Sequence, residues 1–419
     1  MGKVERPAAV VMNMFYTGLG IARSMGEHGI PVIGLSAHKG FCGNLTRYAR
    51  VVSAPDSRSE PEKLLAFLLD MGKKSVERSP LFPTRDDDLV FLDRFRRELE
   101  PFFIPLAPEA PVLEACLNKW ETFLWAKRAG VATPKCWLIE DSRQLSRICD
   151  EVEYPCVLKP VAAYQWRQGN NWGMVGGRKA FAVSSPQELL SEYASIQRAE
   201  RRVLLQEMVP GGDECLVIVG CYLDRQSNWV AGFNAQKLLQ VPEGFGTGCI
   251  VRASNHSELF APTMRLLQQM RFTGMAEVEY KWDTVKREYL LIEINPRPWD
   301  QHRLGVSCGT DLAYFAYCGL TGAEMPPIAA RHPDVKWIAD DVFLMTALRM
   351  LWRRDPKLGA LFRLARGRRI YGICSVKDPL PALALIGWLL RQTFQGAIMA
   401  AGRLAQRLSR RRQPKEALV

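Results

Sequence analysis

Short apolar runs separated by polar and glycine-rich segments mark the N-terminal part of the chain as alternating strands and helices. Residues 8–12 and 30–35 are apolar runs of strand length, and a glycine-rich turn at 16–20 leads from the first run into a helix. A further strand is predicted at 88–92, after a polar loop. Strands that alternate with helices indicate a parallel sheet, so we expect an α/β domain over residues 1–113.

The two glycines of the first turn, Gly18 and Gly20, allow two interpretations. A G-x-G pair could bind a nucleotide, but the pattern alone is a weak indicator of such a site. A tight turn from strand to helix explains it more simply, because glycine tolerates backbone conformations that other residues avoid. We therefore expect a structural role.

The middle of the chain, residues 114–325, mixes helical and strand patterns. A helix is predicted at 114–129, where apolar residues recur at helical spacing. Residues 162–179 are rich in glycine and asparagine and follow neither period, so we expect a flexible loop there. Two strand-like runs, at 276–280 and 289–295, carry carboxylates. We expect this range to form a second domain.

The character of the sequence changes over residues 326–419, which we predict to be a basic helical extension. Within it, residues 382–408 place apolar side chains on one face and polar ones on the other. Arg391 lies inside this segment, and a central arginine is costly in a membrane-spanning helix. The segment therefore favours a helix that lies on a surface. That surface could be a membrane with anionic lipids, a partner protein or the protein's own core.

Composition narrows the class of protein. The chain has 419 residues, a formal charge of +12 and 24% charged residues, which is typical of a globular protein of two to three domains. Much of the positive excess lies in the last ninety or so residues, without aromatic RNA-binding or zinc-finger motifs, so no nucleic-acid partner is expected. The eleven cysteines show no C-x-x-C spacing. They indicate reduced thiols and a cytoplasmic protein.

The chemistry is concentrated in the strand-like run at 289–295. Glu293 and Asn295 are two residues apart and therefore share one face of a strand. Glu277 and Glu279, on the preceding strand-like run, are two further carboxylates with the same spacing. Burying such groups is costly without compensation, and a hard cation with oxygen ligands supplies it. The pattern predicts Mg²⁺ shared with phosphate oxygens; solvated acids on an exposed hairpin are the alternative.

Three lysines and two glutamates precede the carboxylate-bearing runs in the sequence. Lys119 begins a predicted helix, Lys159 ends a predicted strand, and Lys237 follows further along the chain. Lysines that precede an acidic group suit a nucleoside triphosphate with Mg²⁺, because the cations neutralise phosphate oxygens. Glu207 and Glu214 lie on either side of a predicted turn between these lysines.

This order resembles the ATP-grasp superfamily, and within it the carboxylate–amine ligase branch that includes D-aspartate ligase-like enzymes. The motifs that carry the resemblance are Leu-Ile-Glu-Ile-Asn-Pro-Arg at 291–297 and Leu-Gln-Glu-Met-Val-Pro-Gly at 205–211. The resemblance covers about residues 8–325. It implies an α/β (α+β) protein in which a Rossmann-like pre-ATP-grasp domain precedes a two-subdomain ATP-grasp fold. The helical extension follows at the C-terminus.

The resemblance also implies roles for individual residues. The nucleotide, ATP, would be bound by lysines at its phosphates, by a backbone segment at its adenine and by a carboxylate at its ribose. Mg²⁺, or Mn²⁺ in its place, would be held by three oxygen ligands, and an arginine would steady the transferred phosphoryl group. The residues implied are Lys119 and Lys159 for the α- and β-phosphates, Glu207 with Met208 and Val209 for adenine, Glu214 for the ribose, Lys237 for the γ-phosphate, Glu279, Glu293 and Asn295 for the metal, and Arg297 for the phosphoryl group.

The activity implied is the formation of an amide or peptide-like bond from a small carboxylate and an amine through an acyl phosphate. Two alternatives remain open: another ATP-grasp reaction, carboxylating or kinase-like, or a non-catalytic ATP-binding scaffold. The loop at 162–179 would close over the site, with Trp166 and Trp172 as a lid or as anchors. Peripheral contact of residues 382–415 with the inner face of the membrane and a homodimer are further expectations left open.

Overall fold

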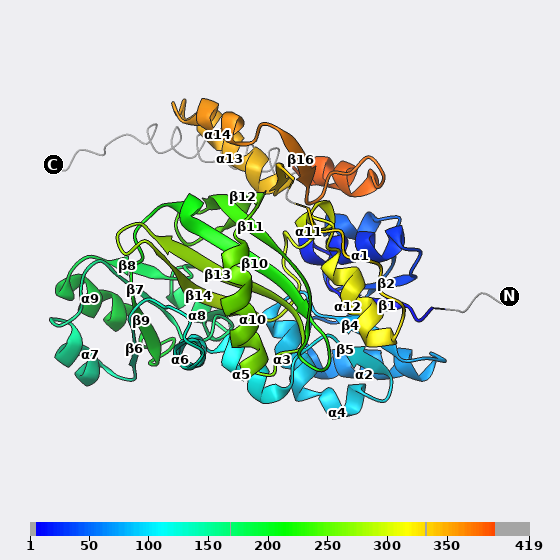
Figure 1. Cartoon of the computed structure of the whole chain (residues 1–419), viewed down its shortest axis with the longest axis horizontal. Helices are drawn as coiled ribbons and strands as arrows, with labels where there is room; N and C mark the ends of the chain where they lie inside the picture. The colour runs from blue at the N-terminus through cyan, green and yellow to red at the C-terminus, as the bar shows by residue number, and fades with distance from the viewer. Residues whose placement is uncertain (1–5, 168, 332, 390–419) are drawn as a thin grey trace, which may run out of the picture.

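The computed structural model describes residues 6–167, 169–331 and 333–389 and contains three β-sheets. Figure 1 shows the N-terminal domain on the lower right, a small sheet at the left-hand end, and a large sheet between them. A layer formed by the C-terminal residues lies above the large sheet. The predicted combination of parallel and antiparallel sheets is therefore present.

The N-terminal domain is built on a five-stranded parallel sheet with the order β3-β2-β1-β4-β5. Its strands are β1 (Ala9–Met12), β2 (Val32–Ser36), β3 (Arg50–Ser53), β4 (Ser79–Phe82) and β5 (Phe103–Pro105). Its helices are α1 (Tyr16–Glu27), η1 (Cys42–Leu45), α2 (Pro61–Lys73), α3 (Asp86–Arg94) and α4 (Arg96–Leu99). The parallel sheet predicted from the first two apolar runs is confirmed.

The strand predicted at 88–92 is wrong, because these residues lie in helix α3. The helix begins with three consecutive aspartates, which are favourable at the positive end of the helix dipole. The Asp88 carboxylate also accepts a hydrogen bond of 3.0 Å from the Arg85 backbone N–H. The true strand of this region is β4, which contains a proline and escaped the pattern.

The glycines of the first turn have the structural role expected of them. A Cβ at Gly18 would lie 1.8 Å from the Asn13 carbonyl oxygen, and one at Gly20 would lie 2.6 Å from Nε2 of His302. The chain turns at Asn13, which has a φ of 66°. Helix α1 can therefore approach the preceding turn and the His302 ring only because both positions lack a side chain.

A four-stranded antiparallel sheet with the order β6-β9-β7-β8 forms the small unit. Its strands are β6 (Cys136–Ile139), β7 (Cys156–Pro160), β8 (Phe181–Val183) and β9 (Val203–Glu207). Its helices are α7 (Ser142–Ile148), η2 (Gln165–Arg167), α8 (Asn171–Met174) and α9 (Pro186–Ile196). The two short helices η2 and α8 lie in the segment that was predicted to be a loop.

The large sheet has seven strands in the order β14-β13-β10-β11-β12-β15-β16. Its strands are β10 (Leu216–Leu223), β11 (Trp229–Val241), β12 (Thr247–Ser254), β13 (Gly274–Asp283), β14 (Glu288–Asn295), β15 (Val335–Ile338) and β16 (Arg368–Tyr371). The associated helices are α5 (Ala110–Leu117), α6 (Lys119–Arg128), η3 (Asp213–Cys215), η4 (Ser257–Leu259), α10 (Phe260–Gln269), α11 (Leu304–Ser307) and α12 (Leu312–Thr321). Its largest hydrophobic core joins residues of the N-terminal domain, this sheet and the C-terminal residues.

Residues 335–389 form what we term the C-terminal layer. Helices α13 (Asp340–Trp352) and α14 (Leu358–Leu364) confirm the helical prediction, but strands β15 and β16 were missed. These two strands extend the large sheet, so this part of the chain is integrated with the second domain rather than appended to it. A further helix begins at residue 380 and reaches the end of the described residues at 389. The rest of the predicted amphipathic segment 382–408 lies outside them.

A buried ion pair ties the C-terminal layer to the N-terminal domain. The Arg23 Nε atom of α1 lies 3.0 Å from a carboxylate oxygen of Asp378, and both side chains are almost fully buried. The Arg23 guanidinium also donates to the Ile373 carbonyl oxygen at 2.7 Å, and the Thr46 hydroxyl donates to Asp378 at 2.7 Å. Each buried charge thus has several partners, which is the condition for burying it without a large penalty.

Three smaller expectations can be compared with the structure. The predicted boundary between residues 113 and 114 falls inside α5, whereas that between 325 and 326 falls between α12 and β15. All eleven cysteines lie among the described residues and are free thiols, as predicted. None of the helices in residues 6–389 combines the length and the apolar character needed to cross a lipid bilayer.

Candidate functional site

A cavity of about 590 Å³ lies where the three sheets meet, and we term it the central cavity. The N-terminal domain contributes Asp86, the small sheet contributes Lys159, and the large sheet contributes Lys237 and Glu293. Most of the residues singled out in the sequence line this cavity. Segments that are far apart along the chain therefore converge on one site.

Two lysines come together on one wall because a helix start meets a strand end. Asn118 caps helix α6 by accepting hydrogen bonds from the backbone N–H groups of Trp120 and Glu121. The Lys119 backbone N–H then donates to the Val161 carbonyl oxygen at 2.8 Å, just beyond β7, which carries Lys159. Burial and the nearby Lys119 charge lower the pKa of Lys159 to about 8.

Lys237 and Glu279 form a buried ion pair across the large sheet. The Lys237 Nζ atom on β11 lies 2.7 Å from Oε1 of Glu279 on β13, and the two strands are separated by β10. Burial opposes the charge on Lys237, but the carboxylate of Glu279 outweighs it and raises the lysine pKa. The pair is therefore charged in spite of its position in the core.

Glu293 and Asn295 face the cavity together, as the two-residue spacing predicted. The Asn295 side-chain amide donates to Glu277 at 3.0 Å and to Glu293 at 3.4 Å, and the Lys119 ammonium lies 3.5 Å from Glu293. Burial opposes ionisation of Glu293, but Lys119 and the other lysines of the cavity lower its pKa to about 2. Glu293 is therefore an anion throughout the neutral range.

Glu277 behaves differently from its neighbours. Burial, and then the charge of Glu279, raise the pKa of Glu277 to about 8. Both carboxylates point to the same face of β13, so the strand brings two like charges close together. One of the two is thus largely protonated at neutral pH, and the one paired with Lys237 is the better anionic ligand.

Arg297 is held by a residue of the N-terminal domain. Its Nε atom lies 2.6 Å from Oδ1 of Asp86, a residue 211 positions away in the sequence. Burial opposes the charge on Asp86, but the Arg297 guanidinium holds the pKa of that carboxyl below its usual range. Nearby, the Thr17 hydroxyl donates to Asp300 at 2.7 Å. The N-terminal domain thus forms part of the site, which sequence reasoning missed.

The glycine-rich segment 162–179 covers one side of the cavity. Trp166 is fully buried and packs edge-on against Phe181 with ring centroids 5.7 Å apart, so it anchors the segment. Trp172 also lines the cavity but is 38% exposed. Arg167 and Lys179 bring two more cations to the cavity wall. The two tryptophans therefore have different environments, one an anchor and one at the opening.

The predicted nucleotide-binding turn after β9 is only partly at the cavity. Met208 and Val209 line it, and the Met208 N–H donates to the Pro155 carbonyl oxygen at 3.2 Å. Glu207 is not a lining residue, because its carboxylate pairs with Lys286 at 2.8 Å. Its main chain nevertheless lies next to the two lining residues.

Asp213, rather than Glu214, points inward at the end of this turn. The Asp213 carboxylate accepts hydrogen bonds from the Gln240 and Gly244 backbone N–H groups at 2.6 and 3.1 Å. It therefore fixes the loop that follows β11. Glu214 is exposed, and its carboxylate folds back over Gly212, where a Cβ would lie 2.5 Å from it. The predicted ribose ligand is thus beside the cavity wall and not in it.

The donor set fits a hard cation only in combination with another ligand. Across the described residues, no three Asp, Glu, His or Cys side chains form a ready-made metal site. Glu279 and Glu293 are each paired with a lysine, and Asn295 adds an amide oxygen. Mg²⁺ is usually bound by one or two carboxylates together with phosphate oxygens and water, which is the number of carboxylates available here.

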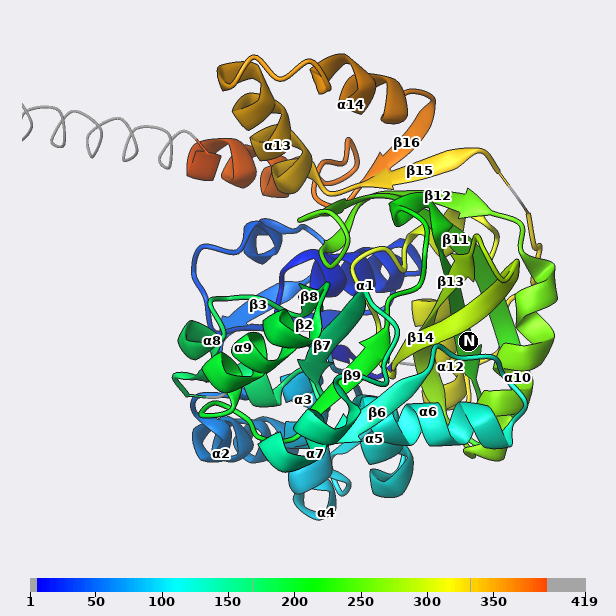
Figure 2. The same ribbon diagram turned by 90° about the vertical axis from the view of Figure 1, so that its left-hand side faces the viewer.

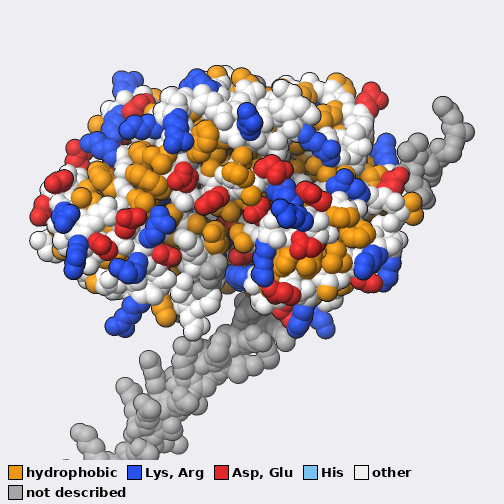
Figure 3. Space-filling model, turned by 90° about the horizontal axis from the view of Figure 1, so that it is seen from below, with side chains coloured by type: hydrophobic (Ala, Val, Ile, Leu, Met, Phe, Trp, Pro, Cys, Tyr) orange, Lys and Arg blue, Asp and Glu red, His pale blue; other side chains and the backbone are white. Residues whose placement is uncertain are grey.

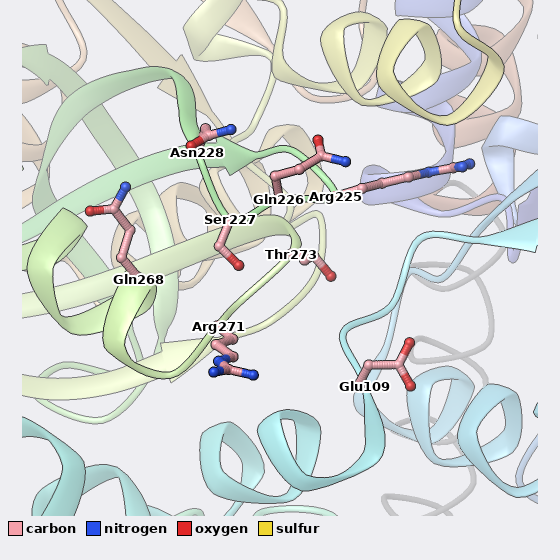
Figure 4. A pocket seen from close by; sticks show the side chains of 8 residues that line it. All are labelled: Glu109, Arg225, Gln226, Ser227, Asn228, Gln268, Arg271 and Thr273. Atoms are coloured by element: carbon pink, nitrogen blue, oxygen red, sulfur yellow. The ribbon is translucent and has the colours of Figure 1, made fainter.

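A second depression, of about 440 Å³, lies away from these residues (Figure 4). It lies between the β10–β11 turn, the segment after α10 and the start of α5, and Arg225, Arg271 and Glu109 contribute charges around it. The Arg225 guanidinium donates to the Leu320 carbonyl oxygen at 2.8 Å, and Glu109 lies 3.5 Å from Arg96. None of the predicted site residues lines this depression.

Two curated proteins of Enterococcus faecium are similar to the chain in sequence. A D-aspartate ligase is 20% identical over 283 residues, which cover 64% of this chain and 66% of that protein. The vancomycin/teicoplanin A-type resistance protein VanA is 28% identical over 106 residues, which cover 25% of this chain and 27% of VanA. The chain therefore spans less than two thirds of either relative. No protein-family model matches it.

Solved structures resemble the chain over most of its length. N5-carboxyaminoimidazole ribonucleotide synthetase, solved as an ADP complex, superposes with a TM-score of 0.64 at 15% identity and covers 84% of this chain and 87% of its own. The biotin carboxylase domain dimer of Hydrogenobacter thermophilus 2-oxoglutarate carboxylase, solved with MgADP, ADP and bicarbonate, superposes with a TM-score of 0.61 at 17% identity and covers 76% and 70%. At this identity the likeness establishes the fold.

Proposed function

We propose that this chain, which has the ATP-grasp fold, is an ATP- and Mg²⁺-dependent ligase that joins a small carboxylate to an amine. The bond formed would be an amide or a peptide-like bond, and the intermediate an acyl phosphate. The sequence similarity to a D-aspartate ligase supports this reaction and supports amino acids as substrates.

The convergence of cations and carboxylates in the central cavity carries the proposal. Lys119, Lys159 and Lys237 reach it from different elements, and two of them are paired with carboxylates in the cavity. A triphosphate with its metal would exchange these pairs, because phosphate oxygens attract the lysines while the metal attracts the carboxylates. Lys119, Lys237 and their two carboxylates would then have a partner of opposite charge both with and without nucleotide.

The metal would be held by Glu279, Glu293 and Asn295 and would neutralise charge on the phosphates. The low pKa of Glu293 supports this assignment, because an ionised carboxylate is available at neutral pH. Glu279 is favoured over Glu277 for the same reason, since the pKa of Glu277 is raised to about 8. Asn295, which bridges the two strands by its hydrogen bonds, would hold the carboxylates in place.

The nucleotide would lie between the small and the large sheet. The Met208–Val209 backbone, next to Glu207, would contact the adenine edge, and the Met208 N–H is already bonded within the protein. Lys119 and Lys159 would bind the α- and β-phosphates, where the lowered pKa of Lys159 would rise again beside an anion. Glu214 would reach the ribose only after its side chain turns away from Gly212.

The reaction requires positioning and charge stabilisation rather than a covalent nucleophile on the protein. The substrate carboxylate would attack the γ-phosphorus of ATP, with Lys237 near that phosphate and Arg297 stabilising the phosphoryl group in transfer. The amine would then attack the acyl carbon and release phosphate. Asp86 would hold Arg297 in position through its 2.6 Å contact. The segment around Trp172 would exclude water, which otherwise hydrolyses an acyl phosphate.

The proposal is tested by ADP and phosphate release from ATP and Mg²⁺ with pooled D- and L-amino acids and small carboxylates. Release that requires both a carboxylate and an amine is the expected result. Glu293→Gln should abolish it, whereas Glu288→Gln, an exposed position on the same strand, should not. Release that depends on bicarbonate alone would indicate a carboxylating enzyme, and release on addition of an alcohol would indicate a kinase. ATP binding without turnover in any pool would favour a scaffold.

A further inference from the structure

The positive charge of the chain is concentrated at its C-terminal end. Residues 340–419 contain 16 of the 56 Lys and Arg residues and five of the 44 Asp and Glu residues, so they carry +11 of the formal charge of +12. The remaining 339 residues are close to neutral. The opposite face of the molecule is consistent with this balance, since acidic and basic side chains are interspersed over it (Figure 3).

The acidic residues of the C-terminal layer do not offset this charge at its surface. Asp340 is buried and accepts hydrogen bonds from the Ile373 and Cys374 backbone N–H groups at 2.7 and 3.0 Å. Asp378 is buried against Arg23. The Asp355 carboxylate, which is only half-buried, accepts a hydrogen bond from the Lys357 backbone N–H at 2.8 Å. The basic residues, by contrast, are exposed. Among the described residues, no carboxylate oxygen lies within 4.0 Å of the side-chain charge of any of the following eight: Arg349, Arg353, Arg354, Lys357, Arg363, Arg366, Arg368 and Arg369.

The same layer exposes large apolar side chains. Trp352 is 84% exposed and Leu351 61% at the end of α13, next to Arg353 and Arg354. Further exposed apolar residues of the layer are Leu344, Met345, Leu348, Phe362, Tyr371, Leu380, Leu383, Ile386 and Trp388. Helices α13 and α14 and the helix at 380–389 lie together on one side of the molecule (Figures 1 and 2). Apolar surface of this extent on one layer indicates an interaction site.

The last described helix shows which way its apolar side chains point. Leu385 and Leu389 are buried against the protein, whereas Leu383 and Ile386 are 60% and 53% exposed. Leu383 and Ile386 begin the apolar face that the sequence predicted for residues 382–408. At its start, therefore, this face does not cover the protein's own core.

We propose that the C-terminal layer binds the surface of a membrane that contains anionic lipids. Arginines would contact the lipid headgroups, while Trp352, Leu351 and their apolar neighbours would enter the boundary between headgroups and acyl chains. The layer exposes basic residues, which match the anionic headgroups, and aromatic and aliphatic side chains, which match the apolar region beneath them. It has no fully exposed acidic residue among those described. This inference does not depend on the proposed ligase activity.

Three other partners for this surface are residues 390–419, a second copy of the chain and a nucleic acid, and each fits it less well. Residues 390–419 contain seven Lys and Arg residues and one Glu, so this segment would bring positive charge onto a positive layer. A second copy would do the same, because the two layers carry the same charge. A nucleic acid would satisfy the arginines but would leave the exposed leucines and Trp352 without an apolar partner.

The test is sedimentation of the full-length protein with lipid vesicles. The probes are vesicles of phosphatidylcholine alone and vesicles of phosphatidylcholine and phosphatidylglycerol in equal amounts, each at low and at high salt. We expect binding to the anionic vesicles only, and weaker binding at high salt because salt screens the arginines. Equal binding to both kinds of vesicle, or to neither, would overturn the proposal.

Two variants of the layer and a matched control locate the contact. Leu351→Glu combined with Trp352→Glu, and separately Arg353→Glu combined with Arg354→Glu, should each weaken vesicle binding by about tenfold or more. Val76→Glu, at a fully exposed apolar position of the N-terminal domain, should leave it unchanged. All of these positions are exposed, so we expect the substitutions to leave the fold intact. A thermal unfolding curve that matches that of the unchanged protein checks this for each variant.

Two results would assign the surface to another occupant. If deletion of residues 390–419 abolished vesicle binding while both paired variants of the layer bound normally, the tail alone would be the lipid contact. If light scattering without lipid showed a dimer that the Leu351→Glu, Trp352→Glu variant lost, the layer would be an interface between copies. Either result would overturn the proposal.

Discussion

The central cavity and the C-terminal layer are both rich in basic residues, but they differ in whether those residues are buried and paired with carboxylates. In the cavity, Lys237 and Arg297 lie 2.7 and 2.6 Å from carboxylates, and all these groups are largely buried. In the layer, Arg353 and Arg354 are exposed and have no acidic partner among the described residues. In the cavity these charges are therefore paired with carboxylates of the protein itself, whereas in the layer the arginines remain exposed to solvent.

This difference separates a site that binds a small charged ligand from a surface that meets a large one. Burying a charge is costly unless a partner lies close to it, so the cavity must carry carboxylates that can be exchanged for phosphate and metal. Exposed arginines carry no such cost in water. They therefore remain available to bind an anionic surface, and the removal of their exposed apolar neighbours from water would favour the same binding.

The largest expected effect comes from removing one partner of a buried ion pair in the cavity. Lys237→Met leaves the buried Glu279 carboxylate without its partner and should lower the free energy of unfolding by about 3–5 kcal/mol. Chemical denaturation measures this change. The double variant Lys237→Met, Glu279→Gln should recover much of the stability, because no charge is then left alone, but none of the activity. A double variant no more stable than the single one would contradict the pairing.

Loss of the tether from the N-terminal domain should act on catalysis in the same cavity. Asp86→Asn removes the charge that holds Arg297 and should lower kcat for ADP release by about ten- to a hundredfold, the usual range for residues that orient a functional group. The KM for ATP should change much less, because Arg297 acts on the phosphoryl group in transfer. Asp87→Asn is the matched control, since Asp87 has Arg58 and not Arg297 as its neighbour. Equal effects of both changes would refute the positioning role.

Removal of positive charge from the C-terminal layer should leave the central cavity intact. Arg353→Glu combined with Arg354→Glu should weaken binding to anionic vesicles by about tenfold or more and leave ADP release in solution unchanged, because neither residue lines the central cavity. Both quantities can be measured on the same preparation. A parallel loss of vesicle binding and ADP release would show that the two regions are not independent.

The smallest effect is a dependence on pH. The pKa of Lys159 is lowered from 10.5 to about 8, so the lysine loses its charge as the pH rises through 8. The kcat/KM for ATP should then fall several-fold, and Lys159→Arg should remove the decline because arginine stays charged. Steady-state kinetics across this range provide the measurement. An identical decline in the variant would assign it to another group.

The same shift has a consequence for stability. Between about pH 8 and 10.5 the unfolded chain holds a proton on Lys159 that the folded protein has released. The contribution of this residue to the free energy of unfolding therefore rises with pH in that window. Denaturation curves of Lys159→Met should lack this rise, and a rise equal to that of the unchanged protein would contradict the assignment.

Local patterns in the sequence predicted most of the elements near the cavity. The two-residue spacing of Glu293 and Asn295 was enough to place both on one face of β14, because that period is a property of the strand itself. The run at 88–92 misled, since a helix beginning with three aspartates is distinguished by its capping and not by its apolar period. Strand β16 was missed because two of its four residues are arginines.

The contacts between domains could not be predicted in the same way. Asp86 reaches Arg297 across 211 positions, and Asp378 reaches Arg23 across 355. Neither pair leaves a periodic trace, because each depends on how the sheets are packed together. The inward turn of Asp213 in place of Glu214 is a similar case, since it is set by the backbone of the loop after β11.

The central claim is that a carboxylate is activated by phosphoryl transfer in the cavity. Pooled amino acids and small carboxylates labelled with ¹⁸O in the carboxyl group test it directly, in the presence of ATP, Mg²⁺ and unlabelled amines. An attack of the carboxylate on the γ-phosphorus predicts one ¹⁸O atom in each phosphate released, as read by mass spectrometry, and no labelled phosphate from Glu293→Gln. Phosphate released without label would mean that none of the labelled carboxylates is the acceptor and would contradict the account.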